Sequence, residues 1–224
     1  MIKNTVFDFD GTIANLFSKK KMQELSNRLS EGLSEKGFPD YFGNAFEILD
    51  QIWRSSMAPS QKNILLSYAD GLISYYERRY ALDCEPVEGA VECLEKLHRE
   101  GFGVGIVTNN SESCVNQFIK TRLSFSPPVV GRNVGAMEKM KPRAFPIIEL
   151  ASFFGCGTDR ILLIGDSLQD YYCSVNSGCR FAAMAQREGK TEKFLEAGLL
   201  DDRILSSCDQ IYKLIGKMNS EQMC

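Results

Sequence analysis

Two aspartates near the start of the chain have the spacing of a reactive pair. Asp8 and Asp10 come at the end of an apolar run from Ile2 to Phe9 that is typical of a buried strand, and Gly11-Thr12 follows at once. Because strand side chains alternate between faces, both carboxylates are expected on the same face. Neighbouring carboxylates repel each other and lose hydration. The pair therefore predicts a bound cation, a shared proton or direct participation in a reaction.

Further polar groups follow two later apolar runs that also predict strands. They are Thr108 and Asn109 after Phe102 to Val107, and Asp166 and Asp170 after Ile161 to Ile164. Lys141, before Pro142, adds a cation ahead of a predicted helix. Taken singly, each group has an ordinary interpretation, such as a solvated lysine or acidic partners of a helix dipole. In a parallel sheet, however, ligands bind beyond the carboxyl ends of the strands, so the groups are expected to converge there.

The elements that must position these groups alternate between helix and strand from Glu88 onward. Short apolar strands separated by helices predict an α/β fold, a Rossmann-like doubly wound parallel sheet with helices on both faces. Between residues 16 and 84 the apolar positions instead recur at helical spacing, with no convincing strand. The sequence thus predicts a core domain of residues 1–15 and 85–224, and an inserted helical domain of residues 16–84.

Composition excludes several classes of protein. The 224 residues are 44% hydrophobic and 25% charged, as in ordinary globular proteins, and the net charge of −3 gives no general attraction for nucleic acid. No apolar stretch approaches the length of a transmembrane helix. Met1 to Asn4 leads straight into the first strand, which leaves no room for a signal peptide. We therefore expect a cytoplasmic protein, a monomer or homodimer, without a nucleic-acid or membrane partner.

Cysteine and histidine chemistry is also disfavoured. The eight cysteines include no C-x-x-C pair, and they are expected to be mostly buried, free thiols. The single histidine, His98, sits on a predicted amphipathic helix, where a surface or helix-end role is expected. A triad based on histidine is therefore not predicted.

Four short motifs, in order along the chain, resemble those of the haloacid dehalogenase superfamily, in its phosphatase branch related to phosphoglycolate phosphatase. They are Asp8-Phe9-Asp10-Gly11-Thr12, Thr108-Asn109, Lys141-Pro142 and Gly165-Asp166-Ser167-Leu168-Gln169-Asp170. The first and fourth motifs are highly specific, whereas the second and third are weak by themselves. The helical insertion lies where that branch carries its cap domain, so the resemblance covers nearly the whole chain.

The resemblance implies a role for each motif. Asp8 would be the nucleophile that forms an aspartyl-phosphate, and Asp10 would be the general acid and base. Mg²⁺ would bind Asp8, the backbone carbonyl of Asp10, and Asp166.

The remaining motif residues would support this chemistry. Thr108 and the backbone N–H of Asn109 would hold phosphate oxygens, and Lys141 would offset their negative charge. Asp170 would support the metal site or hold Lys141. The expected substrate is a small phosphorylated metabolite, because a cap over the strand ends leaves no room for a protein chain.

Three other functions compete on this scaffold. A dehalogenase is disfavoured because its reaction has no leaving oxygen for Asp10 to protonate. A phosphomutase of the β-phosphoglucomutase type is the alternative, although Thr12 replaces the apolar residue of such mutases. A non-catalytic phosphate-binding protein is the least favoured, because the carboxylate cluster is intact. For substrate recognition, Lys19-Lys20-Lys21 and Arg54 are candidate cations, although a solvated helix face is the simpler interpretation of the lysine run.

Overall fold

The strands of this computed structural model, which describes residues 1–38, 43–186 and 189–221, form a parallel sheet in the order β3-β2-β1-β4-β5-β6. They are β1 (Asn4–Phe7), β2 (Gly103–Val107), β3 (Val129–Val130), β4 (Ile161–Gly165), β5 (Arg180–Met184) and β6 (Ile204–Leu205). In the register, Phe7 of β1 pairs with Ile106 and with Ile164. The central strands therefore end at nearly the same level.

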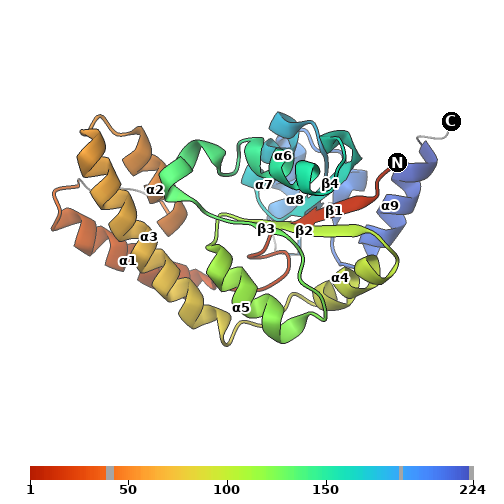
Figure 1. Cartoon of the computed structure of the whole chain (residues 1–224), viewed down its shortest axis with the longest axis horizontal. Helices are drawn as coiled ribbons and strands as arrows, with labels where there is room; N and C mark the ends of the chain where they lie inside the picture. Colours follow the sequence, from red (N-terminus) through yellow and green to blue (C-terminus); the bar gives the residue numbers. More distant parts are fainter. Residues whose placement is uncertain (39–42, 187–188, 222–224) are drawn as a thin grey trace.

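Successive residues of each strand pack into opposite apolar clusters. Phe7 and Ile164 join the cluster formed with α4 (Ala90–Arg99), α5 (Glu112–Arg122) and α9 (Gln210–Glu221), whereas Val6 and Leu163 join the other. The second cluster is formed with α6 (Phe145–Phe153), α7 (Leu168–Ser177) and α8 (Lys190–Glu196). Helices thus cover both faces of the sheet (Figure 1). The predicted α/β class and doubly wound arrangement are confirmed.

Residues 16–84, called the helical insert below, carry α1 (Lys19–Ser34), α2 (Ala45–Arg54) and α3 (Pro59–Ala81). The N-terminus of each helix has a local cause. Ser18 accepts a hydrogen bond from the Lys21 amide before α1, Asn44 forms a capping box with Glu47 before α2, and Pro59 opens α3. In Figure 1 the insert lies beyond the carboxyl ends of the strands.

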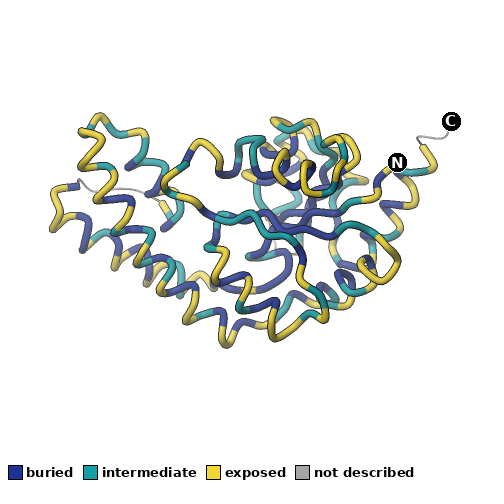
Figure 2. Tube along the Cα trace, in the orientation of Figure 1, coloured by how far each residue is buried: buried dark blue, intermediate teal, exposed yellow. Residues whose placement is uncertain are grey.

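The insert is joined to the sheet by two adjacent segments of chain. The amide of Asn15 donates to the carbonyl of Glu85 (2.9 Å), and the amide of Val87 donates to the carbonyl of Ile13 (2.8 Å). A single apolar cluster contains residues of both parts, such as Leu25 and Ile73 of the insert and Phe9 after β1. Buried stretches occur along both the insert and the sheet (Figure 2). The division into two domains stays a prediction.

Some elements differ from the sequence-based expectation. The first strand ends at Phe7, because the amides of Ile13 and Ala14 both donate to the carbonyl of Phe9 and turn the chain. The short α8 and β6 were not predicted, nor was the 3₁₀ segment Val134–Lys139 before Lys141. Each is too brief for its period to stand out.

The predictions for cysteine and histidine are confirmed within the described residues. The seven cysteines there are free thiols, five of them buried, and Cys224 lies outside the described part. His98 is exposed in the last turn of α4 and stacks on Phe125, with ring centroids 3.9 Å apart. In the described part of the chain, no helix combines the length and apolar character that a membrane crossing requires.

Candidate active site at the strand ends

Lys141 is the centre of the site. Its Nζ donates to Asp8 Oδ1 (2.6 Å), Asp170 Oδ1 (2.5 Å) and the Val107 carbonyl (3.2 Å). The Lys141 and Asp8 side chains are less than 10% exposed, and that of Asp170 is fully buried. Three strand ends and the loop before α6 therefore meet, as the sequence predicted.

The capping of α7 fixes Asp170. Ser167 is the N-cap residue and Asp170 the third helical residue, so the pair forms a capping box. Asp170 Oδ2 accepts from Ser167 N (3.1 Å) and Ser167 Oγ (2.6 Å), which leaves Oδ1 for Lys141. Because both carboxylate oxygens have partners, Asp170 is placed to hold Lys141.

Asp8, Asp166 and Asp170 form the acidic cluster of the site. One oxygen from each lies within 4.8 Å of the other two, and all three residues are buried. Gly11, at a φ of 90°, allows this approach, because a Cβ there would collide with the Asp166 carboxylate. An all-oxygen donor set suits a hard divalent cation such as Mg²⁺ or Ca²⁺. The residues present therefore fit such an ion.

The buried charges shift the pKa values of the site. Burial raises the pKa of Asp8 well above its usual value, Lys141 opposes this rise, and Asp170 and Asp166 add to it. Burial lowers the pKa of Lys141, but the carboxylates of Asp170 and Asp8 raise it by more, so the lysine stays protonated. A bound cation would favour the ionised form of Asp8.

Asp10 lies on the insert side of the cluster. Its Oδ1 accepts hydrogen bonds from the amides of Leu16 (2.8 Å) and Phe17 (3.1 Å), where the chain enters the insert. These bonds set the orientation of the carboxyl group. Asp10 also lines two adjoining cavities, described below.

Residues 108–111, called the β2 loop below, follow the adjacent strand. Thr108 Oγ1 donates to Asn110 Oδ1 (2.8 Å) and accepts from the Asn110 amide (3.1 Å). Asn109 Nδ2 donates to Gln169 Oε1 (2.8 Å) and to the carbonyl of Lys141 (3.2 Å). Both predicted phosphate-binding residues, Thr108 and Asn109, therefore lie at the site.

The sequence interpretation missed several residues. Lys190, at the start of α8, donates to the carbonyl of Asp166 (2.7 Å) and makes a short contact with its carboxylate. Glu77 of α3 and Arg132, after β3, form a buried ion pair beside the β2 loop. The sequence could have indicated Glu77, because this charged residue interrupts an apolar stripe at helical spacing with Ile73. Arg132 and Lys190 had none, because each lies outside any periodic pattern.

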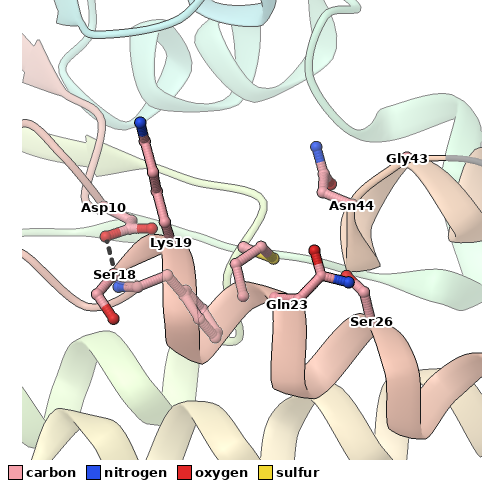
Figure 3. A pocket seen from close by; sticks show the side chains of 9 residues that line it. Asp10, Ser18, Lys19, Gln23, Ser26, Gly43 and Asn44 are labelled. Atoms are coloured by element: carbon pink, nitrogen blue, oxygen red, sulfur yellow. Dashed lines mark hydrogen bonds between the residues drawn. The ribbon is translucent and has the colours of Figure 1, made fainter.

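Two cavities meet at Asp10. The first, called the carboxylate cavity, has a volume of about 310 Å³ and is lined by Asp8, Asp10, Lys141 and Asp166 among others. The second, called the insert cavity, measures about 510 Å³. Figure 3 shows that its labelled lining comes from Asp10 and from the insert, namely Ser18, Lys19, Gln23, Ser26, Gly43 and Asn44. Met22 and Asn44 also line both cavities, so the two lie side by side.

The candidate cations of the insert occupy different positions. Lys19 lines the insert cavity, Lys20 is exposed, and Lys21 lies over the Tyr80 ring (4.5 Å to the centroid). Arg54 pairs with Asp50 one helical turn earlier (2.5 Å). Lys19 therefore lines a cavity that includes Asp10, whereas Arg54 lines a third cavity, which includes Lys141 and Asn109.

Three curated relatives are distant in sequence but match most of the chain. A phosphoglycolate phosphatase of Thiobacillus denitrificans is 25% identical over 191 residues, which are 80% of this chain and 81% of that protein. The pyrophosphatase PpaX of Bacillus cereus (strain AH820) is 23% identical over 227 residues, covering 97% and 98%. An uncharacterised hydrolase of Saccharomyces cerevisiae is 25% identical over 224 residues, covering 98% and 94%.

Solved structures share the fold. A HAD hydrolase of family IA, variant 3, from Entamoeba histolytica has a TM-score of 0.70 at 13% identity, covering 96% of this chain and 98% of that one. A HAD family hydrolase from Deinococcus radiodurans, solved with bound phosphate and sodium, has a TM-score of 0.60 at 15% identity, covering 96% of each chain. The family model for the haloacid dehalogenase-like hydrolases matches residues 5–184. The chain therefore belongs to the haloacid dehalogenase-like hydrolase family.

Proposed function

We propose that this phosphatase hydrolyses a small phosphomonoester with Mg²⁺ bound at the acidic cluster. The observation that carries the proposal is Lys141, fixed between Asp8 (2.6 Å) and Asp170 (2.5 Å) beside Asp166 in a cavity at the strand ends. A buried ammonium beside a carboxylate nucleophile suits a reaction that brings a phosphate dianion to that carboxylate.

Asp8, Asp166 and the backbone carbonyl of Asp10 would hold the cation, with Asp170 in support. When bound, Mg²⁺ supplies positive charge that offsets the repulsion between phosphate and nucleophile. Lys141 adds a fixed positive charge at the same place. Thr108 and the amide of Asn109 would hold the oxygens of the transferred group.

In the proposed reaction, an Asp8 carboxylate oxygen attacks phosphorus while the bond from phosphorus to the ester oxygen breaks. Asp10 gives its proton to that oxygen, and an alcohol leaves. Asp10, now a carboxylate, takes a proton from a water molecule whose oxygen attacks the aspartyl-phosphate. Inorganic phosphate is released, and both aspartates return to their starting states.

The insert cavity offers space for the leaving group of this reaction. It adjoins Asp10 and has a mixed lining, in which Phe17 and Met22 stand beside polar side chains such as that of Gln23 (Figure 3). A leaving group that extends from the carboxylate cavity past Asp10 would enter it. We therefore propose that the insert is a cap whose cavity receives a small leaving group.

The test is a hydrolysis screen that follows phosphate release with Mg²⁺ and with excess EDTA. The panel includes 2-phosphoglycolate and pyrophosphate, because relatives carry the corresponding names, and also sugar phosphates and p-nitrophenyl phosphate. We expect release that requires the divalent ion, and a higher unfolding temperature with Mg²⁺ plus orthovanadate. Full activity in EDTA would contradict the metal assignment. Accumulation of glucose 6-phosphate from β-glucose 1-phosphate would instead indicate a mutase.

A further inference from the structure

A buried ion pair connects the helical insert with the core. Glu77 of α3 and Arg132 have fully buried side chains, and their closest atoms, Oε1 and Nη1, lie 2.7 Å apart. The same guanidinium donates to Asp70 Oδ1 (2.7 Å) and Ser74 Oγ (2.8 Å). Three side chains of α3, at successive steps of about one helical turn, therefore hold one arginine of the core.

Glu77 also holds the β2 loop. Its Oε1 accepts from Asn110 Nδ2 (3.0 Å), and its Oε2 accepts from the Ser111 amide (3.1 Å). Asn110 Oδ1 in turn accepts from the Thr108 hydroxyl (2.8 Å). The Asn110 side chain thus links the Glu77 carboxylate of the insert to the Thr108 hydroxyl, which is proposed to bind phosphate.

Arg132 holds the β2 loop from its backbone side. Its Nη1 donates to the carbonyl of Asn109 (2.9 Å), and its amide donates to the carbonyl of Asn110 (2.8 Å). Burial lowers the pKa of Arg132, but Glu77 and Asp70 raise it by more, so the guanidinium stays charged. Asn110, Ser111 and Arg132 all donate hydrogen bonds to the Glu77 carboxylate, and the positive charge of Arg132 balances the negative charge of that carboxylate.

We propose that Glu77 and Arg132 are positioning residues of the phosphatase, and that their ion pair holds the β2 loop in the geometry that binds the transferred phosphate. The inference rests on the proposed function, which assigns Thr108 and Asn109 to phosphate. A pair that only fastened the insert to the core would not need the bonds to Asn110, Ser111 and the Asn109 carbonyl. Those three bonds all end on the β2 loop.

The deciding variant is Glu77→Gln, with Asp70→Asn as its matched control. The amide nitrogen that Glu77→Gln introduces would face donors, so at least one bond to the β2 loop or to Arg132 is lost. Asp70 contacts the same guanidinium through Oδ1, and its side chain is 34% exposed. Both variants remove one carboxylate from Arg132. They therefore differ chiefly in the contact with the loop.

The measurements are KM for p-nitrophenyl phosphate and the inhibition constants of inorganic phosphate and orthovanadate. They are made at a temperature at which unfolding curves show each variant to be folded. We expect Glu77→Gln to raise all three constants in parallel, by up to about 100-fold, because moving a binding group out of its correct position can cost a factor of that order. Asp70→Asn should leave them little changed even if its unfolding temperature falls equally.

If Glu77→Gln does not fold, the test uses a second variant, Arg132→Lys, which keeps the positive charge. An ammonium cannot reach the Asn109 carbonyl and both Glu77 oxygens as the planar guanidinium does, so the same parallel rise is expected. Unchanged phosphate and vanadate inhibition in a folded variant, with only lowered stability, would overturn the inference and leave the proposed function intact. If the unaltered protein neither hydrolyses any phosphate ester nor binds phosphate, the proposed function fails and the inference fails with it.

Discussion

The strand ends and the helical insert line two adjoining cavities with different kinds of side chain. At the strand ends, Asp8, Lys141 and Asp170 are buried and joined by bonds of 2.5 to 2.6 Å. In the insert, Lys19 and Gln23 are exposed residues of α1 that line the wider cavity (Figure 3). Buried charges that are bonded to one another keep one geometry, whereas exposed side chains can be substituted at little cost in stability.

The two regions thus differ in how they hold the side chains around the cavities. The proposed nucleophile, Asp8, and its counter-charge, Lys141, are held where strands and a capped helix set their positions. The side chains proposed to select among leaving groups belong to the insert, which reaches the cavities from one side. The Glu77–Arg132 pair is the exception, because there the insert holds a loop of the core.

The largest expected effect comes from the proposed nucleophile. Asp8→Asn should reduce phosphate release by about 10⁴-fold or more, because an amide cannot form the phosphoenzyme. The measurement is phosphate release in the steady state together with acid-quenched trapping of the phosphoenzyme. Asp83→Asn, at an exposed position outside both cavities, is the control. A trapped phosphoenzyme in the Asp8 variant would place the nucleophile elsewhere.

A smaller effect, which depends on the substrate, is expected at Asp10. Asp10→Asn should slow hydrolysis of alkyl phosphates by about 10²- to 10⁴-fold, because the leaving alkoxide then lacks its acid. Aryl phosphates such as p-nitrophenyl phosphate have better leaving groups and should lose less. The two kcat/KM losses are measured side by side. Equal losses would show that Asp10 does not protonate the leaving oxygen.

The chemistry of the strand ends was predictable because local patterns encode it. Asp8 and Asp10 come just after the end of β1 and line one cavity. The spacing of Ser167 and Asp170 is that of a capping box, which the structure contains. The parallel sheet then brings those groups to one edge, as the alternating strands and helices predicted. Each of these steps depends on spacing along the chain alone.

The remaining contacts depend on tertiary packing that no local pattern specifies. Lys190 reaches Asp166 only because β5 lies beside β4 in the sheet. Arg132 meets Glu77 only because α3 packs against the core. The insert cavity likewise depends on how α1 and α2 approach each other, which helical periodicity does not determine. Substrate preference was therefore not predictable, whereas the reaction class was implied by the resemblance of the four motifs to a known superfamily.

The smallest expected effect tests the insert side of the comparison at Lys19. This lysine lines the insert cavity, so it should favour a leaving group that carries a negative charge. Lys19→Met should raise KM for 2-phosphoglycolate by roughly 2- to 5-fold, because exposed ion pairs contribute about 0.2 to 1 kcal/mol. It should leave kcat, and KM for p-nitrophenyl phosphate, nearly unchanged. The difference should shrink at high ionic strength, where exposed charges are screened.

Lys20→Met is the matched control, since Lys20 is exposed on the same helix but does not line the cavity. A large loss of kcat in Lys19→Met would break the comparison, because an exposed side chain of the insert would then take part in the chemistry.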